Sequence, residues 1–336
     1  MRLGVFGAGM IVHDFLTMFD QVEGLQLAYI CATPGEEEVL KGLCETYRIP
    51  KYYTNVHEAF TDDSADTCYI GVPNHLHFAF VEEALRSGKH VICEKPFTVN
   101  YEEAQKLKEL AEEKDLFLLE AVSTHYLPNY LKIRELLPTL GELKLVEMNF
   151  SNLSSRYPRF QQGEILPAFD VNKAGGALMD INIYNLNFVA GLFGEPEQIH
   201  YYPNIERQID TSGVLVLEYP GFKCVLVGAK DCSSPINANV QGVTRYINID
   251  SPVNLLTGFR VKDVVRYGNN EVTDEYFNYN DPDKHRMYYE FTEFVRILKE
   301  NDKEKAKEML ELSLLVSKLQ TKARLEAGIV FPQDKG

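Results

Sequence analysis

The stretch Arg2-Leu3-Gly4-Val5-Phe6-Gly7-Ala8-Gly9-Met10-Ile11-Val12 decides the fold class. Its first five residues are mainly apolar and predict a β-strand, and apolar residues take up helical spacing after Gly9. Gly7 allows a tight turn, and Gly9 lets the backbone approach a pyrophosphate, which the positive end of the following helix attracts. Val12 stands where this fingerprint has Gly or Ala, so we expect the helix to lie slightly farther from the strand. The residues predicted to bind a dinucleotide here are Gly7, Ala8, Gly9, Met10 and Ile11.

Strand-like and helix-like segments alternate from this stretch to residue 121. Apolar runs predict strands at Leu25–Ala32, Thr67–Val72 and Leu116–Ala121, with helices between them. Such alternation is typical of a parallel, doubly wound sheet, in which ligands bind at the carboxyl ends of the strands. We therefore predict an α/β protein whose first domain, residues 1–122, binds a dinucleotide on a doubly wound parallel sheet.

The ends of the predicted strands carry further candidate cofactor residues. The second strand ends in Ala32-Thr33-Pro34, which offers neither a carboxylate for the ribose of NAD nor an arginine for the 2′-phosphate of NADP. Glu36 and the two acids after it are expected to begin the next helix. The cofactor is thus NAD or NADP, and the lack of an acid at the strand end favours NADP. The candidates at the strand ends are Thr33, Val72, Pro73, Asn74, His75, Glu94 and Lys95.

A charged pair follows the strand in Lys89-His90-Val91-Ile92-Cys93-Glu94-Lys95-Pro96. A lysine at the carboxyl end of a strand can be partly desolvated, which suits an amine to acid/base work. A surface Lys-Pro turn is the alternative interpretation, and the Lys95–Pro96 bond is a candidate for the cis form. His75-x-His77 does not predict a metal site, because helical positions two apart do not share a face and no third ligand lies nearby.

The second half of the chain changes character. A polar and aromatic segment runs from Ser154 to Asn172, and it is either a functional loop or a mobile surface loop. Gly175-Gly176 then precede a helix that places Asp180 and Tyr184 one turn apart. Segments between Glu197 and Asn278, the last of them Val261–Tyr267, read as consecutive strands of a mostly antiparallel sheet. Residues 123–336 are therefore predicted to form an α+β domain, whose last helix could pack back on the first domain.

Composition excludes several classes of protein. The 336 residues carry a net charge of −15, which argues against nucleic acid or an anionic membrane as a partner. No apolar run approaches the roughly 18 residues of a membrane span. Because a strand begins almost at the first residue, we expect no signal peptide. The six cysteines are scattered without a Cys-x-x-Cys motif, as in a reduced cytoplasmic protein.

Four motifs, in this order, resemble the glucose–fructose oxidoreductase / inositol dehydrogenase family of nicotinamide-dependent oxidoreductases. They are the glycine turn, Pro73-Asn74-His75, Glu94-Lys95-Pro96, and Gly175-Gly176-Ala177-Leu178-Met179-Asp180 with a polar residue four positions later. Many members have His where this chain has Tyr184, so it is most similar to the branch with dihydrodiol dehydrogenase. The resemblance implies an N-terminal Rossmann domain, and a C-terminal domain whose large, open, mostly antiparallel sheet commonly packs against a second subunit.

The resemblance also implies hydride transfer between a nicotinamide and a carbinol or carbonyl carbon of a sugar, polyol or vicinal diol. Tyr184 would be the acid/base, Lys95 would stabilise negative charge on the reacting oxygen, and Asp180 would orient Lys95 or bind a neighbouring hydroxyl. Two alternatives remain: a nicotinamide-using glycoside hydrolase, and a non-catalytic regulator on the same fold. The substrate pocket could extend to His125, Arg156, Arg159 and Lys173.

Overall fold

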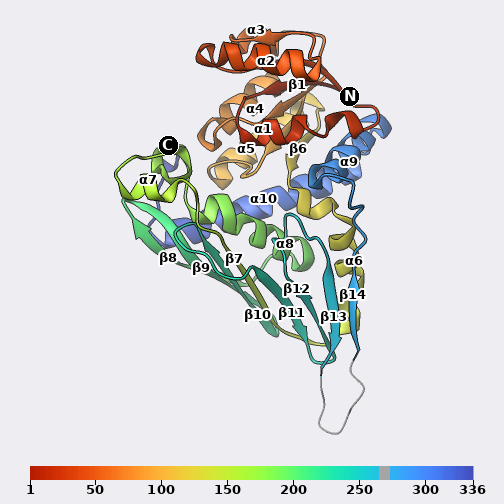
Figure 1. Ribbon diagram of the computed structural model, residues 1–336, viewed down its shortest axis with the longest axis vertical. Coiled ribbons are helices and arrows are strands. Elements are labelled where there is room, and N and C mark those ends of the chain that lie inside the picture. The colour runs from red at the N-terminus through yellow and green to blue at the C-terminus, as the bar shows by residue number, and fades with distance from the viewer. Residues whose placement is uncertain (265–272, 336) are drawn as a thin grey trace. The chain divides into compact units, whose positions relative to one another are not determined.

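A computed structural model describes residues 1–264 and 273–335, and their contacts divide the chain into two compact units (Figure 1). Unit 1 comprises Met1–Ala121 and Met287–Ser317. Unit 2 comprises Val122–Arg286 and the described residues from Lys318 on. The first division lies one residue before the predicted boundary, but residues 287–317, which we placed in the second domain, belong to unit 1.

Unit 1 contains the predicted doubly wound parallel sheet, which is confirmed. Among the described residues its strand order is β3-β2-β1-β4-β5-β6, and every neighbouring pair is parallel. The order reverses between β1 and β4, the position at which such sheets bind ligands. The strands are β1 (Arg2–Phe6), β2 (Gln26–Cys31), β3 (Tyr52–Tyr53), β4 (Thr67–Ile70), β5 (His90–Glu94) and β6 (Leu118–Ala121). The helices of this part of the chain are α1 (Met10–Leu16), α2 (Glu37–Tyr47), α3 (Val56–Phe60), α4 (His77–Arg86) and α5 (Tyr101–Lys114), followed near the C-terminus by α9 (Arg286–Glu300) and α10 (Lys303–Glu326).

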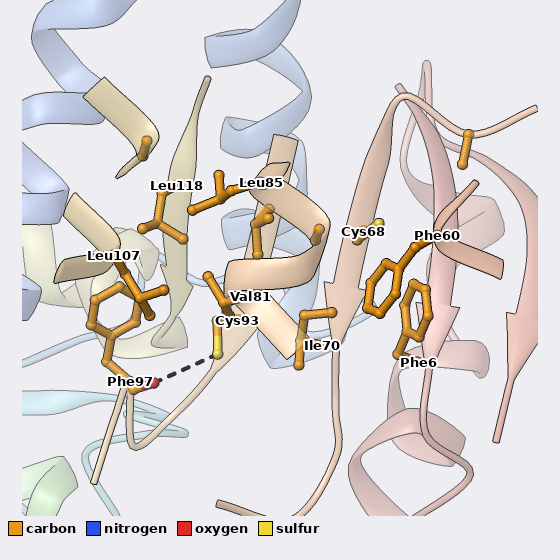
Figure 2. Packing of buried hydrophobic residues seen from close by; sticks show 14 of the residues in the cluster. Phe6, Phe60, Cys68, Ile70, Val81, Leu85, Cys93, Phe97, Leu107 and Leu118 are labelled. Carbon is orange, nitrogen blue, oxygen red and sulfur yellow. Dashed lines mark hydrogen bonds between the residues drawn. The ribbon is translucent and has the colours of Figure 1, made fainter. Parts of the chain in front are cut away.

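Both faces of this sheet are covered by apolar side chains. On one face Phe6 stacks on Phe60, and aliphatic residues of α4 and α5 continue the cluster (Figure 2). On the other face the ring of Phe291, from α9, contacts the rings of Phe15 and Tyr69. Each such fully buried ring contributes roughly 1.5–3 kcal/mol. These contacts explain why α9 belongs to unit 1 although it lies far along the chain.

Unit 2 is built on the predicted open sheet, which is also confirmed. Among the described residues its order is β14-β13-β12-β11-β7-β10-β9-β8, antiparallel except for the parallel pair β7–β10. Helix α8 (Ile183–Phe193) packs on β7 and β10. The strands are β7 (Leu143–Ser151), β8 (Gln198–Glu206), β9 (Ile209–Tyr219), β10 (Phe222–Ala229), β11 (Asn237–Gly242), β12 (Arg245–Ile249), β13 (Phe259–Asp263) and β14 (Asp274–Phe277). Two further helices are α6 (Pro128–Leu136) and α7 (Tyr157–Gln161).

Two segments differ from the expected pattern. The predicted strand Val261–Tyr267 is seen only as far as Asp263, and its residues from 265 on lie outside the described part of the chain. The segment Ser154–Asn172 contains α7 and a 3₁₀ turn at Pro167–Phe169. In this segment the rings of Phe160 and Phe169 stack at 4.8 Å and are both buried. It is therefore a packed part of unit 2.

Candidate active site

The glycine turn lies at the point where the strand order of unit 1 reverses. Gly7 has φ +114°, which favours glycine, and a Cβ atom on it would lie 2.4 Å from the carbonyl oxygen of Gly71, just after β4. Gly9 is the N-cap of α1, and a Cβ atom there would meet nothing within 4 Å among the described residues. The neighbouring Met10 is 70% exposed. This open cradle at a helix N-terminus fits the pyrophosphate of a dinucleotide.

Val12 is accommodated by a glycine on the facing strand. The Val12 side chain is fully buried. A Cβ atom on Gly71 would lie only 2.8 Å from its Cγ2 atom. The fingerprint has its small residue on the helix, whereas here the small residue is Gly71, after β4. Because Gly71 leaves room for Val12, the helix does not need to lie farther from the strand, as we had expected it to.

His77, at the first position of α4, ties together the loops after β4 and β5. Its Nδ1 atom lies 2.8 Å from the carbonyl oxygen of Pro96, and its Nε2 atom lies 2.9 Å from that of Val72. Burial, opposed by these carbonyl contacts, lowers the pKa of this imidazole. The predicted cofactor residues Val72, Pro73, Asn74 and His75 lie in the first of the two loops. His77 was considered only for a metal site, whereas the structure gives it this structural role.

Lys95 follows directly on β5, and buried neighbours fix its backbone. The Lys95–Pro96 peptide bond is cis, as the sequence suggested. The backbone N–H of Lys95 donates to the Glu94 carboxylate over 3.3 Å, and the Tyr69 hydroxyl donates to the same carboxylate over 2.7 Å. The Cys93 thiol contacts the carbonyl oxygen of Phe97 at 3.7 Å (Figure 2). Glu94 and Lys95 thus stand at the carboxyl edge of the sheet, with the Lys95 side chain half-buried.

A second buried carboxyl group lies beside this pair. Glu120, on β6, is 5% exposed and is paired in register with Cys93 of β5. Burial raises its pKa to about 7, and the neighbouring Glu94 charge adds to that rise. The Ser313 hydroxyl, the Phe97 amide and the Lys95 charge act in the opposite direction. The local sequence Leu-Leu-Glu-Ala of this strand did not indicate that the glutamate would be buried beside Glu94.

The end of β2 has a carboxylate nearby after all. Glu36 lies in the 3₁₀ turn Pro34–Glu36 before α2, close to where we expected the helix to begin. Its Oε2 atom accepts hydrogen bonds from the Thr33 hydroxyl (2.7 Å) and the Thr33 backbone N–H (3.2 Å). The side chain thus reaches back to Thr33, one of the predicted cofactor residues. The premise that no acid stands at this strand end is therefore wrong.

In unit 2, a buried carboxylate caps the helix that carries Asp180. Gly176 has φ +106°, and a Cβ atom on it would lie 2.1 Å from the Asp210 carboxylate. That carboxylate accepts the backbone N–H of Leu178 and the hydroxyl of Tyr201, each over 2.7 Å. Burial raises the pKa of Asp210 to about 6, against these two donors. Gly176 is therefore needed to let the chain approach Asp210. A Cβ atom on Gly175 would instead lie 2.6 Å from the carbonyl oxygen of Pro167.

The helix itself begins with a π-helical turn, Leu178–Asn182, and continues as α8. Such turns are rare and are frequent at functional sites. The side-chain amide of Asn182 donates to the carbonyl oxygen of Leu226, and that of Asn185 donates to Val227. A Cβ atom on Gly228 would lie 2.5 Å from the Cβ atom of Asn182. Buried amides and a small strand residue thus fix the helix on β10.

Asp180 and Tyr184 both have half-buried side chains on this helix. The Asp180 carboxylate forms an ion pair with Lys230, at 2.5 Å between Nζ and Oδ2. The Tyr184 ring lies 6.0 Å from that of Phe150, on β7. No sequence motif pointed to Lys230, because it lies 50 positions from Asp180.

The four residues proposed for the substrate pocket are dispersed in unit 2. His125 is buried, and its Nε2 atom hydrogen-bonds the Asn187 side chain over 3.1 Å. Arg159 is exposed and forms an ion pair with Glu164. Arg156 and Lys173 are half-buried, before α7 and in the 3₁₀ turn Val171–Lys173. The position of His125 gives no support to a substrate contact, and the other three stay predictions.

Within residues 1–264 and 273–335, no group of three or more His, Cys, Asp or Glu side chains is arranged to hold a metal ion. In the same part of the chain, none of the helices has the length and apolar character needed to span a membrane.

Comparison with known proteins identifies the family. A model described as an oxidoreductase family with an NAD-binding Rossmann fold matches residues 1–121. The chain is 31% identical to scyllo-inositol 2-dehydrogenase (NADP(+)) IolU of Bacillus subtilis, over 100% of this chain and 99% of the relative. It is 30% identical to trans-1,2-dihydrobenzene-1,2-diol dehydrogenase of Sus scrofa, again over 100% and 99% of the two chains.

Solved structures share the fold over nearly the whole chain. The 3-ketoreductase KijD10 of Actinomadura kijaniata, solved in complex with NADP, superposes with a TM-score of 0.80 over 97% of both chains at 19% identity. A biliverdin reductase from Synechocystis, solved with biliverdin and NADP+, superposes with a TM-score of 0.77 over 97% of this chain and 99% of its own, at 18% identity. Because the two dehydrogenases match over nearly their full length, the chain belongs to the oxidoreductase family with the NAD-binding Rossmann fold. This is the glucose–fructose oxidoreductase / inositol dehydrogenase family that its motifs predicted.

Proposed function

We propose that this member of the family is an NADP-dependent dehydrogenase or reductase acting on a secondary hydroxyl group, or its ketone, in a polyol or vicinal diol. The observation that carries the proposal is that one chain combines the glycine cradle, Lys95 at the end of β5, and Asp180 on a π-turn with Tyr184 on the helix that continues it. The two most similar relatives described above are named for an inositol and for a vicinal diol, which supports this substrate class.

The proposed roles follow from the chemistry of each side chain. A bound nicotinamide would supply or accept the hydride at the carbon that bears the reacting oxygen. Lys95, as an ammonium group, donates a hydrogen bond to that oxygen and stabilises negative charge on it. Tyr184 transfers the hydroxyl proton. Asp180 keeps a 41% exposed side chain while paired with Lys230, so its carboxylate can accept a hydrogen bond from a second hydroxyl of the substrate.

The cofactor preference rests on the end of β2. NADP is supported by the name of the inositol dehydrogenase and by the NADP held in the KijD10 structure. Glu36 opposes it, because a carboxylate held at Thr33 would repel a 2′-phosphate. We expect Glu36→Gln to tighten NADPH binding several-fold and to leave NADH binding nearly unchanged. Because the chain has no tryptophan, nicotinamide fluorescence measures both affinities directly. Equal effects on the two cofactors would place Glu36 away from the phosphate.

The activity is tested by following the nicotinamide absorbance with inositols, sugars and vicinal diols as substrates. Lys95→Met and Tyr184→Phe should each lower kcat by about 10²–10⁴-fold while NADPH still binds. Lys114→Met and Tyr202→Phe are matched controls, because both side chains are exposed and lie outside the proposed machinery. Full activity in both site variants would overturn the proposed roles.

Other outcomes would point to the alternative functions. Cofactor binding without turnover on the whole panel would favour a regulator. Release of a sugar from a glycoside without a net absorbance change would favour a hydrolase. We also propose a cytoplasmic location, on the cysteine pattern alone, and a homodimer through the sheet of unit 2.

A further inference from the structure

Lys230 is a buried lysine that follows β10 and touches two separate parts of unit 2. Its side chain is 4% exposed. The Nζ atom donates to Asp180 Oδ2 over 2.5 Å and to the carbonyl oxygen of Ala168 over 2.9 Å. The ring of Phe169 lies beneath the same ammonium group, with its centroid 4.7 Å away. One cation thus joins the π-turn of Asp180 to the 3₁₀ turn Pro167–Phe169.

The local backbone holds Lys230 at this point. The N–H of Lys230 donates to the carbonyl oxygen of Thr211, on β9, over 2.8 Å. The carbonyl of Ala168 also accepts the N–H of Gly176, in the glycine pair before the π-turn. The contacts of Lys230 therefore form part of a fixed frame that includes both ends of the Asp180 motif. A lysine serving only the core would not need a carboxylate that keeps 41% of its side chain exposed.

Other ionisable groups lie around the pair. Asp210, on β9, is close enough for the charge of Lys230 to lower its pKa against the dominant effect of burial. Asp231 follows Lys230 in the chain, and its carboxylate accepts hydrogen bonds from Thr211 and Ser212. The Tyr201 hydroxyl donates a hydrogen bond to the Asp210 carboxylate, and Tyr184 lies one turn beyond Asp180. Among these carboxylates, Asp180 is the one whose side chain contacts the ammonium group directly.

We propose that Lys230 is a positioning residue for Asp180. It fixes one oxygen of the carboxylate, keeps the group ionised, and so holds it in one orientation toward the substrate hydroxyl that it binds in the proposed function. This inference rests on the proposed function, in which Asp180 binds that hydroxyl, and deepens it by naming the residue that sets the geometry. Because the same ammonium group binds the carbonyl oxygen of Ala168, it also fixes the turn that carries Phe169.

The test compares Lys230→Met, Lys230→Arg and the control Lys223→Met. Lys223 lies on β10, the strand that Lys230 directly follows, and is half-exposed in an ion pair with Glu218. We expect Lys230→Met to lower kcat/KM at least tenfold. The acidic limb of the pH profile of kcat/KM should also move to higher pH by about 1 unit or more in this variant. The reason is that the lost ammonium group favours the carboxylate form of Asp180 in the wild type. Lys230→Arg should recover most of the activity and the original limb, and Lys223→Met should match the wild type in both.

A purely structural role predicts a different pattern. It would lower the melting temperature of Lys230→Met while leaving the pH profile of the remaining folded enzyme unchanged, and that result would overturn the proposal. If Lys230→Met does not fold, Asp180→Asn decides: a wild-type pH profile in Asp180→Asn would contradict the proposed role. The double variant Lys230→Met/Asp180→Asn should lose little beyond Asp180→Asn alone, because the two residues act together.

A readout without turnover separates this inference from the proposed function. With ¹³C-labelled aspartate, the signal absent from Asp180→Asn identifies the Asp180 carboxyl group. We expect its titration to move to higher pH in Lys230→Met and to stay unchanged in Lys223→Met. That result supports the positioning role even if no polyol or diol is a substrate. An unchanged titration would overturn it even if the enzyme proves active.

Discussion

At the scale of single residues, Val12 and Gly71 share one small space. An alanine at position 71 would place its Cβ atom 2.8 Å from Val12 Cγ2, and a β-branched side chain cannot easily move aside. We expect Gly71→Ala to destabilise unit 1 by about 1–3 kcal/mol and to weaken NADPH binding, because the first turn of α1 must shift. Urea denaturation and nicotinamide fluorescence measure the two effects.

The double variant Val12→Ala/Gly71→Ala makes this prediction specific. Removing the valine methyl groups frees the space that the new Cβ atom needs, so most of the lost stability should return. Gly42→Ala is the control, because its Cβ atom would meet nothing within 4 Å in the described chain and α2 should gain slightly in stability. Additive losses in the double variant would show that the contact is not the cause.

Glu120 makes stability depend on pH. Burial raises its pKa to about 7, above the value of about 4.3 expected in the unfolded chain, so the folded state binds the extra proton between these values. Its contribution to stability is therefore complete below pH 4 and is lost as pH rises through about 7. From pH 5 to pH 8 the wild type should lose on the order of 1–3 kcal/mol relative to Glu120→Gln.

Denaturation by urea at the two pH values checks this prediction. Other ionisable groups, including Asp210, are the same in both proteins and cancel in the difference. Glu113→Gln is the control, because that side chain is 70% exposed on α5 and should follow the wild type. Parallel stability curves for wild type and Glu120→Gln would mean that Glu120 is already ionised at pH 5.

Sequence reasoning reached the residues whose chemistry is written in local motifs. The positions of Gly7, Gly9 and Lys95 at strand ends of unit 1 could be predicted, because the strand and turn signals that define them lie within a few residues of one another. Lys230 and Gly71 were missed because each matters through a partner distant in sequence. A lysine after a strand and a glycine before a loop carry no local sign of such partners.

At the scale of elements, the C-terminal end of α10 is fixed by a buried ion pair. Arg324 is 1% exposed and binds both carboxylate oxygens of Asp334, while its Nη1 atom also donates to the carbonyl oxygen of Ile329. The guanidinium group lies 4.1 Å from the centroid of the Phe331 ring. Residues after the helix are thereby folded back onto its last turn.

Breaking this pair should be costly. Arg324→Met leaves the Asp334 carboxylate buried without its cation, and we expect a loss of about 3–5 kcal/mol in the free energy of unfolding. Adding Asp334→Asn should restore part of that loss, because the unpaired charge is gone. Lys318 lies on the same helix, and Lys318→Met, which breaks its exposed ion pair with Glu195, should cost about 1 kcal/mol or less. Similar losses in Arg324→Met and Lys318→Met would contradict the argument from burial.

The elements also show where periodicity falls short. Apolar spacing predicted a helix through Asp180, but its first turn is π-helical, and the cause is tertiary: Asp210 caps it and Asn182 anchors it to β10. The segment from Ser154 to Asn172 read as a long loop because its apolar residues are few. They nevertheless suffice for a stacked pair, Phe160 with Phe169.

At the scale of the whole molecule, the sheet of unit 2 has two faces of different character. One face is buried under α8, with Cys224 and Leu226 pointing inward from β10. The opposite face carries valines in register on adjacent strands, Val225 beside Val216 and Val227 beside Val214, and these four side chains are only half-buried. An apolar centre of this kind suits a second copy of the chain, related by a two-fold axis that pairs the face with itself.

We therefore expect the wild type to sediment at twice the mass of one chain, and Val225→Asp to sediment at the mass of one chain. The new carboxylates would lie desolvated near the two-fold axis in a dimer, whereas in a monomer they remain in water. Val39→Asp is the control, because that valine is 44% exposed on α2 and the change should leave the mass unaltered. A wild type that sediments as a monomer at micromolar concentration would refute the dimer. A Val225→Asp variant that remains dimeric and folded would move the interface to another surface.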